Sequence, residues 1–135
     1  SMKDVLNARI KHRESFRPFA PAILEEKTSH YFDLDRSSPF MLLIAKGAEE
    51  KRESIPAVLH VDSTARVQTV VKEREGIFYE LVSAFERLTG VPVILNTSFN
   101  DSGEPIVETP RDALNMFCRN ELDYLFMGDY VVWKK

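Results

Sequence analysis

The segment 77–95 places a strongly amphipathic helix pattern directly before a short apolar strand pattern. Its apolar residues recur at the spacing of one helical face: Phe78, Leu81, Val82, Phe85 and Leu88. Gly90 is typical of a helix C-cap, and residues 91–95 are β-branched and apolar and lead into a polar loop. A helix followed at once by a buried strand predicts an α/β domain.

Other apolar runs continue this alternation. Residues 40–46, 57–61 and 65–71 predict further short strands. Residues 19–24 contain a proline, which favours an edge strand or an extended segment. We therefore expect a mixed sheet with helices packed against it.

The last third of the chain carries clear local signals. Thr109 followed by Pro110 and Asp112 predicts a helix start with a side-chain cap. Residues 124–127 and 130–133 flank Gly128-Asp129 and predict a hairpin.

Length and composition narrow the classes of protein. A chain of 135 residues fits one domain, 1–135, in which Ser1-Met2 is typical of a tag remnant. The net charge of −3 argues against broad nucleic-acid binding. No apolar run is long enough to cross a membrane and no secretory signal is present, so we expect a cytoplasmic protein.

Cys118 is the lone cysteine, which excludes an internal disulfide and a cysteine-rich zinc site. Its spacing from Leu114 and Phe117 predicts that it packs in the core on one helix face. The three histidines lie too far apart in sequence to suggest a ligand set, so no metal site is expected.

Three polar segments could carry chemistry. The first holds Lys11, Arg13 and Arg17, a local cluster of cations on an acidic chain. Guanidinium groups grip phosphate oxygens in a fork, whereas lysine offers a point charge. The segment therefore predicts either a site for a phosphate-like anion or an ordinary solvated charged stretch.

The second segment places His60 at the end of a predicted strand and Arg66 after a turn. An imidazole and a guanidinium at one rim could hold a phosphoryl or carboxylate oxygen. They could equally be a structural histidine and an arginine paired to an acidic neighbour.

The third segment follows the predicted strand 91–95 and contains Asn96, Ser98 and Asn100. Loops at the carboxyl ends of strands commonly bind ligands in α/β folds. Uncharged donors and acceptors suit an amide-like group or a ribose. The alternative is a turn whose side chains only satisfy backbone groups.

Together these segments and the tail resemble a known family. The segments are 11–21 (KHRESFRPFAP), 60–68 (HVDSTARVQ), 90–100 (GVPVILNTSFN), 103–110 (GEPIVETP) and 123–128 (DYLFMG). In order and over nearly the whole chain, they resemble the carbamoyltransferase C-terminal domain of NodU-type nodulation proteins and antibiotic O-carbamoyltransferases. Within 62–64 one position departs from the family pattern, where glycine is expected.

The resemblance implies a YrdC-like α/β fold, related to the enzymes that make threonylcarbamoyl-adenylate. It implies that the domain binds ATP and carbamoyl phosphate and forms carbamoyl-adenylate, with Mg²⁺ held mainly by the phosphates. An N-terminal domain of the actin-like ATPase type then transfers the carbamoyl group to a substrate hydroxyl. That domain is absent from this chain, so we expect activation without transfer.

The resemblance also assigns residues. Lys11, Arg13 and Arg17 would bind phosphates, and Asn96, Ser98 and Asn100 would hold the nucleotide or the carbamoyl group. His60 and Arg66 would contact the reacting phosphoryl or carbamoyl oxygens. Two alternatives stay open: a non-catalytic nucleotide- or phosphate-binding module, and an RNA-binding YrdC-like domain.

Overall fold

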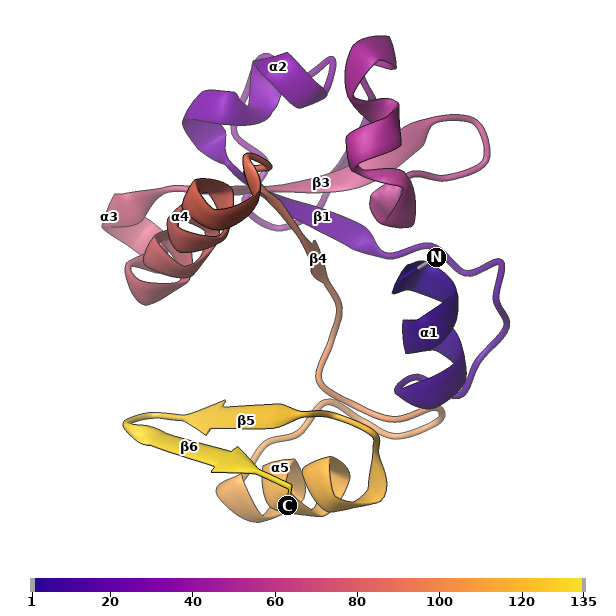
Figure 1. Ribbon diagram of the computed structural model, residues 1–135, viewed down its shortest axis with the longest axis vertical. Helices are drawn as coiled ribbons and strands as arrows, with labels where there is room; N and C mark the ends of the chain where they lie inside the picture. Colours follow the sequence, from indigo (N-terminus) through magenta and orange to yellow (C-terminus); the bar gives the residue numbers. More distant parts are fainter. Residues whose placement is uncertain (1, 135) are drawn as a thin grey trace. The chain divides into compact units, whose positions relative to one another are not determined.

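The structure is a computed structural model that describes residues 2–134. The chain forms two compact units, and we describe each by itself (Figure 1). Residues 18–97 form the sheet unit, and residues 1–17 with 98–135 form the terminal unit. Of the expected tag remnant, Ser1 lies outside the described residues, whereas Met2 begins a helix.

The sheet unit contains a four-stranded sheet in the order β2-β3-β1-β4. β1 runs parallel to β3 and antiparallel to β4, and β2 runs antiparallel to β3, so the sheet is mixed as expected. The bounds are Ala20–Leu24 for β1, Leu43–Lys46 for β2, Thr64–Val70 for β3 and Val93–Asn96 for β4.

The expectation that residues 19–24 form an edge strand or an extended segment is wrong, because β1 lies between β3 and β4. Pro21 is tolerated there for a geometric reason. The Leu24 amide donates to Pro92 on the β4 side, and strand amides alternate in direction, so the Pro21 nitrogen points toward β3. Pairing with β3 begins only at Ala22, so no ladder bond is lost at the proline.

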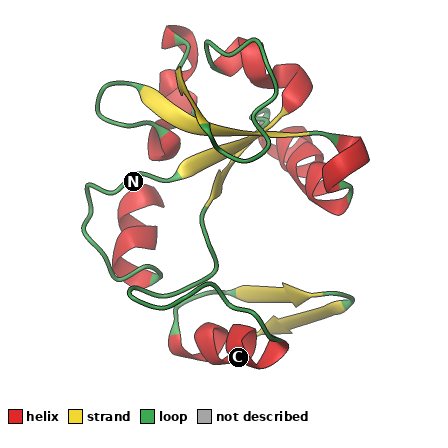
Figure 2. Cartoon of the chain, turned by 180° about the vertical axis from the view of Figure 1, so that it is seen from behind, coloured by secondary structure: helices red, strands yellow, loops and turns green. Residues whose placement is uncertain are grey.

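Short helical elements surround this sheet. In chain order they are η1 (Glu25–Lys27), α2 (Thr28–Tyr31), η2 (Glu49–Ser54), η3 (Pro56–Val58), α3 (Lys72–Glu75) and α4 (Ile77–Thr89). The strand expected at 57–61 is wrong, since a 3₁₀ turn with proline at its first position occupies its first half. Figure 2, coloured by secondary structure, shows in green the loops that connect these short elements.

The two faces of the sheet are packed differently. One face carries the main core, in which Ile23, Val67 and Val93 lie with Tyr31, Phe32, Ile55 and Val58 from the surrounding turns. α4 packs against β1 and β4, but only Val82 is buried among its residues. Leu81 and Leu88 on the predicted apolar face remain 57% and 86% exposed, so that face is only partly covered.

The terminal unit combines α1 (Met2–Arg9), α5 (Pro110–Arg119) and a hairpin of β5 (Tyr124–Met127) and β6 (Tyr130–Trp133). The predicted hairpin and helix start are confirmed, and Thr109 and Asp112 form a reciprocal capping box. Ala113, Phe117 and Leu125 form a small core between α5 and the hairpin.

The prediction that Cys118 packs in this core is wrong, because its side chain is exposed. The buried face of α5 runs through Ala113, Met116 and Phe117 instead. Leu114, 38% exposed, lies at the margin of that face. The spacing identified the helix correctly but placed its buried stripe one residue too far along the chain.

Candidate functional site

Lys11 lies at the centre of the best-organised group of predicted site residues. It follows α1, is only 4% exposed, and its Nζ donates to oxygens of a loop 87–89 residues away in sequence. The acceptors are the Asn100 carbonyl at 2.6 Å, Asn100 Oδ1 at 2.7 Å and the Ser98 carbonyl at 3.0 Å. A lysine has three donors, so the loop engages all of them.

The loop itself is tightly hydrogen-bonded. Ser98 Oγ donates to Asn100 Oδ1 at 2.5 Å, and Asn100 Nδ2 donates to the Glu104 carbonyl at 2.8 Å. The structure thus brings together Lys11, Ser98 and Asn100, which the sequence placed in two separate motifs. In this arrangement Lys11 holds the loop in place by direct bonds.

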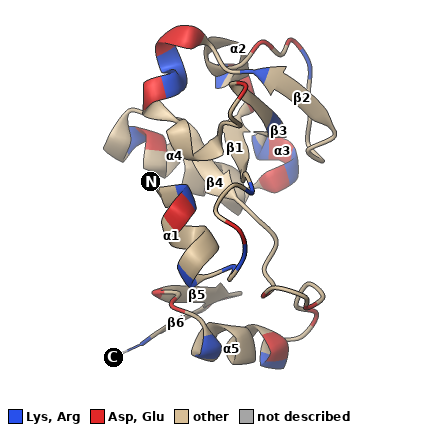
Figure 3. Cartoon of the chain, turned by 90° about the vertical axis from the view of Figure 1, so that its right-hand side faces the viewer, with Lys and Arg blue, Asp and Glu red and all other residues tan. Residues whose placement is uncertain are grey.

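Figure 3 shows Lys and Arg in blue on α1 and the chain near it, with Asp and Glu in red among them. Burial lowers the pKa of Lys11, and the nearby Arg13 guanidinium lowers it further, against an opposing effect of Asp101. Burial also lowers the pKa of Arg13, with Arg17 as the next cause. Glu14, whose Oε2 lies 2.8 Å from Arg17 Nε, opposes this effect on Arg13. Three cations close together in sequence could still attract an anion.

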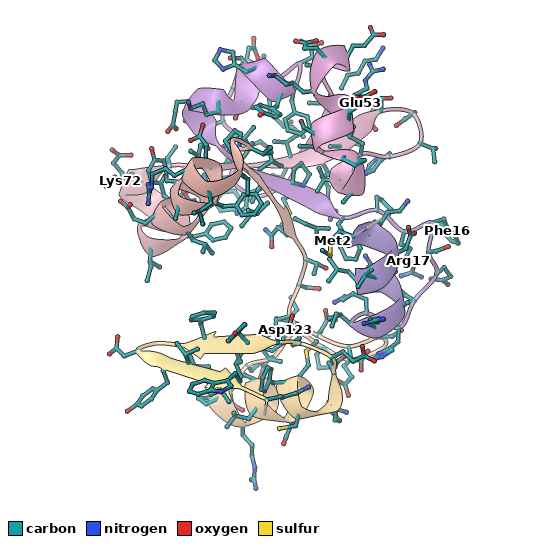
Figure 4. All side chains as sticks on the ribbon, viewed as in Figure 1. Met2, Phe16, Arg17, Glu53, Lys72 and Asp123 are labelled. Atoms are coloured by element: carbon teal, nitrogen blue, oxygen red, sulfur yellow. The ribbon has the colours of Figure 1, made fainter. Side chains whose placement is uncertain are left out.

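Asn7 organises the segment that carries these cations, although sequence reasoning passed over it. It is 1% exposed, and its Oδ1 accepts from Arg13 Nε at 2.8 Å. Its Nδ2 donates to the carbonyls of Arg17 at 2.9 Å and Ser15 at 3.3 Å. Figure 4 shows Arg17 on the loop that Asn7 fastens. The available signal was that Asn7 shares a helical face with the buried Ile10.

Asp101 and His12 form a second polar contact in the terminal unit. His12 has a backbone φ of 43°, in the left-handed region, and its Nδ1 lies 2.9 Å from Asp101 Oδ1. The Ser102 amide also donates to Asp101 Oδ1, at 2.6 Å. The hydrogen bond from His12 is the largest cause that lowers the pKa of Asp101, followed by that from Ser102.

This contact predicts a pH-dependent stability. Because the folded pKa of Asp101 lies below the unfolded value of about 3.9, its stabilisation is complete above that value and is lost as pH falls through the folded pKa. We expect Asp101→Asn to lower the free energy of unfolding near neutral pH. In urea titrations between about pH 6 and about pH 2.5, the difference from wild type should shrink toward acid; a constant difference would contradict this.

His60 and Arg66 belong to the sheet unit, and no hydrogen bond joins them among the described residues. His60 Nδ1 lies 3.1 Å from Thr64 Oγ1, which in turn donates to Asp62 Oδ1 at 2.7 Å. These bonds with Thr64 lower the pKa of Asp62. Ser63 adopts φ 65°, a left-handed conformation, which accounts for the glycine expected within 62–64. His60 therefore contacts a residue of its own turn.

Asn96 ends β4, and its Nδ2 donates to Oε1 of Gln68 on β3. Arg66 lies on β3 two residues before Gln68 and is exposed. The sheet unit therefore gathers Arg66, Gln68 and Asn96 at its strands, whereas the terminal unit gathers Lys11, Arg13, Ser98 and Asn100. Sequence reasoning included Gln68 in a motif without giving it a role.

Within residues 2–134, no group of three or more His, Cys, Asp or Glu side chains is placed to hold a metal ion. A surface hollow near η1 is lined by three carboxylates and one cation, so its net charge is unsuited to phosphate. The charged lining residues are Glu25, Glu26, Asp35 and Arg36. Across the same described residues, the helices are all too short or too polar to cross a membrane.

Comparison with known proteins places these features in a family. The family described as "Carbamoyltransferase C-terminus" matches residues 1–134. The chain is 45% identical to nodulation protein NolNO of Sinorhizobium fredii over 98% of its own length and 20% of that protein. It is 42% identical to nodulation protein U of Rhizobium tropici, over 76% of its own length and 18% of that protein.

A further relative is an uncharacterized protein of Synechocystis, 45% identical over 99% of this chain and 25% of the relative. The chain thus spans a quarter or less of the length of these three curated relatives. The match covers both motif segments that Lys11 joins and the hairpin that closes the terminal unit. The chain belongs to the carbamoyltransferase C-terminus family.

Proposed function

We propose that this chain is the ATP- and carbamoyl-phosphate-binding domain of an O-carbamoyltransferase, that it forms carbamoyl-adenylate, and that its α/β fold is YrdC-like. The observation that carries the proposal is the group built on Lys11. A buried ammonium holds the Ser98–Asn100 loop, and Arg13 and Arg17 follow it at once in the chain. Positive charge beside fixed polar groups is what a phosphate-rich ligand requires.

The chemistry needs positioning and charge neutralisation more than a nucleophilic side chain. Carbamoyl phosphate, water and ATP would give carbamoyl-adenylate, phosphate and pyrophosphate. Water first cleaves the bond between the carbamoyl and phosphate groups of carbamoyl phosphate, which gives carbamate and phosphate. A carbamate oxygen then bonds to the α-phosphorus of ATP as the bond from that phosphorus to pyrophosphate breaks. Mg²⁺ would accompany the nucleotide, held mainly by phosphate oxygens.

Each predicted residue has a proposed role, although that of Lys11 changes from phosphate binding to positioning a loop. Arg13 and Arg17 neutralise phosphate charge, and Lys11 positions the loop that offers Ser98 and Asn100. In the sheet unit, His60, Arg66 and Asn96 are the proposed contacts to phosphoryl, carbamoyl or nucleotide groups. The partner that passes the carbamoyl group to a hydroxyl would be the actin-like ATPase-type domain of a longer protein.

Arg13→Ala tests this proposal. We expect it to weaken binding of both ATP–Mg²⁺ and carbamoyl phosphate by about ten- to a hundredfold, because a charge-assisted contact contributes roughly 1.5–3 kcal/mol. Calorimetric titration of the wild type and the variant measures the change. Arg111→Ala, an exposed arginine at the start of α5, is the matched control and should bind as the wild type does. Equal affinities for wild type and Arg13→Ala would refute the phosphate site.

A further inference from the structure

Two side-chain amides meet above the strand that separates them in the sheet. Gln68 on β3 and Asn96 on β4 flank β1, where Ala22 pairs with Gln68 and Ala20 pairs with Asn96. Paired residues, and residues two apart in one strand, point to the same face of a sheet. Gln68, Ala20, Ala22 and Asn96 therefore share one face.

The contact depends on the two alanines. Strands are about 4.8 Å apart, so the amides cross about 9.6 Å of sheet surface above β1. Alanine is small enough to leave that path clear, and Asn96 Nδ2 reaches Gln68 Oε1. This face is the one opposite the Ile23, Val67 and Val93 core.

The bond fixes which groups the pair offers outward. Asn96 uses a donor and Gln68 uses its acceptor, so Asn96 Oδ1 and Gln68 Nε2 are left to bind something else. Among the described residues, no hydrogen bond is recorded for either atom. The pair thus presents one acceptor and one donor, held in a fixed relation.

Arg66 adds a cation to the same face. It lies two residues before Gln68 on β3, opposite Ile44 of β2. Its side chain is exposed and makes no hydrogen bond or ion pair with any described residue. A guanidinium with its donors unused can take an anionic oxygen.

We propose that Gln68 and Asn96 form a recognition pair for a planar group that carries an N–H donor beside an acceptor, with Arg66 meeting an attached phosphate. Within the proposed function, on which this inference rests, two ligand groups have that chemistry: the carbamoyl group of carbamoyl phosphate and the amino edge of adenine in ATP. Gln68 supplies the donor and holds the Asn96 amide in the orientation that exposes its acceptor. It is a specificity-determining residue.

Matched ligands test the pair. Acetyl phosphate replaces the amino group of carbamoyl phosphate by methyl, and purine riboside triphosphate lacks the 6-amino group of ATP. We expect the wild-type 135-residue chain to prefer the amino-bearing member of one pair at least about fivefold. Gln68→Glu keeps an acceptor for Asn96 but loses the outward donor, and Gln68→Met loses both.

In both variants the preference should fall to within about twofold, as measured by calorimetric titration. Ratios cancel the general effect of the added glutamate charge on phosphate binding. Asn115→Asp, an exposed amide changed to an acid on α5, is the control and should keep the wild-type ratio.

The outcomes separate this inference from the proposed function. A collapsed carbamoyl ratio or a collapsed adenine ratio supports the pair and identifies its ligand. Unchanged ratios overturn it, even if Arg13→Ala weakens binding and so upholds the phosphate site. A collapsed ratio together with no effect of Arg13→Ala upholds the pair and refutes that site. If the wild type binds none of the four compounds, both are overturned.

Discussion

Replacing Lys11 with methionine is expected to lower the free energy of unfolding of the terminal unit by about 2–3 kcal/mol. The substitution keeps the apolar stem and removes the ammonium that donates to Ser98 and Asn100. Hydrogen bonds to charged groups contribute roughly 1.5–3 kcal/mol each, and the burial cost that lowers the pKa of Lys11 offsets part of their sum. The net effect remains large because one side chain joins segments 87–89 residues apart.

Unfolding of the terminal unit can be measured separately by tryptophan fluorescence. The single tryptophan, Trp133, lies in β6, so its fluorescence follows urea unfolding of the terminal unit. Lys72→Met is the control, because Lys72 is exposed and belongs to the sheet unit. An unfolding free energy for Lys11→Met within about 0.5 kcal/mol of wild type would show that the lysine does not hold the loop.

The sequence predicted those helices and hairpins that depend on residues close together in the chain. The helix at Ile77–Thr89 and the hairpin at 124–133 follow from periodicity and turn residues a few positions apart. The interior place of β1 could not be predicted, because it depends on which neighbour the Pro21 nitrogen faces. The same limit applies to Cys118, where a shift of one residue separates a buried from an exposed helical position.

The candidate site divides in the same way. The cation segment and the Asn96–Asn100 loop were each visible as unusual clusters, but only the family resemblance linked them, since nothing local relates residues 11 and 100. The role of Gln68 could not be read from the sequence, because its partner Asn96 lies on the far side of β1. Asn7 was hidden for a similar reason: its helical spacing from Ile10 was the one local signal, and that spacing does not show that Asn7 holds the carbonyls of Ser15 and Arg17.

Asn7→Ala is expected to destabilise the terminal unit by about 2–4 kcal/mol and to weaken phosphate binding as well. The change removes the Asn7 oxygen that accepts from Arg13 Nε and the Asn7 amide that donates to the carbonyls of Ser15 and Arg17. Asn7 is 1% exposed, so water cannot readily replace these bonds. Loss of one partner from a buried group typically costs about 1–3 kcal/mol. The phosphate effect follows because Arg13 loses the acceptor that orients it.

Asn7→Asp separates the effect of Asn7 on stability from its effect on phosphate binding. Aspartate keeps an acceptor for Arg13 but loses both donors to the carbonyls of Ser15 and Arg17. We expect it to retain more phosphate affinity than Asn7→Ala while still losing stability, as followed by Trp133 fluorescence in urea and by calorimetric titration with carbamoyl phosphate. Asn115→Ala, an exposed amide on α5, should change neither. If Asn7→Ala kept both wild-type stability and wild-type affinity, the segment that carries Arg13 and Arg17 would not depend on Asn7 for its conformation.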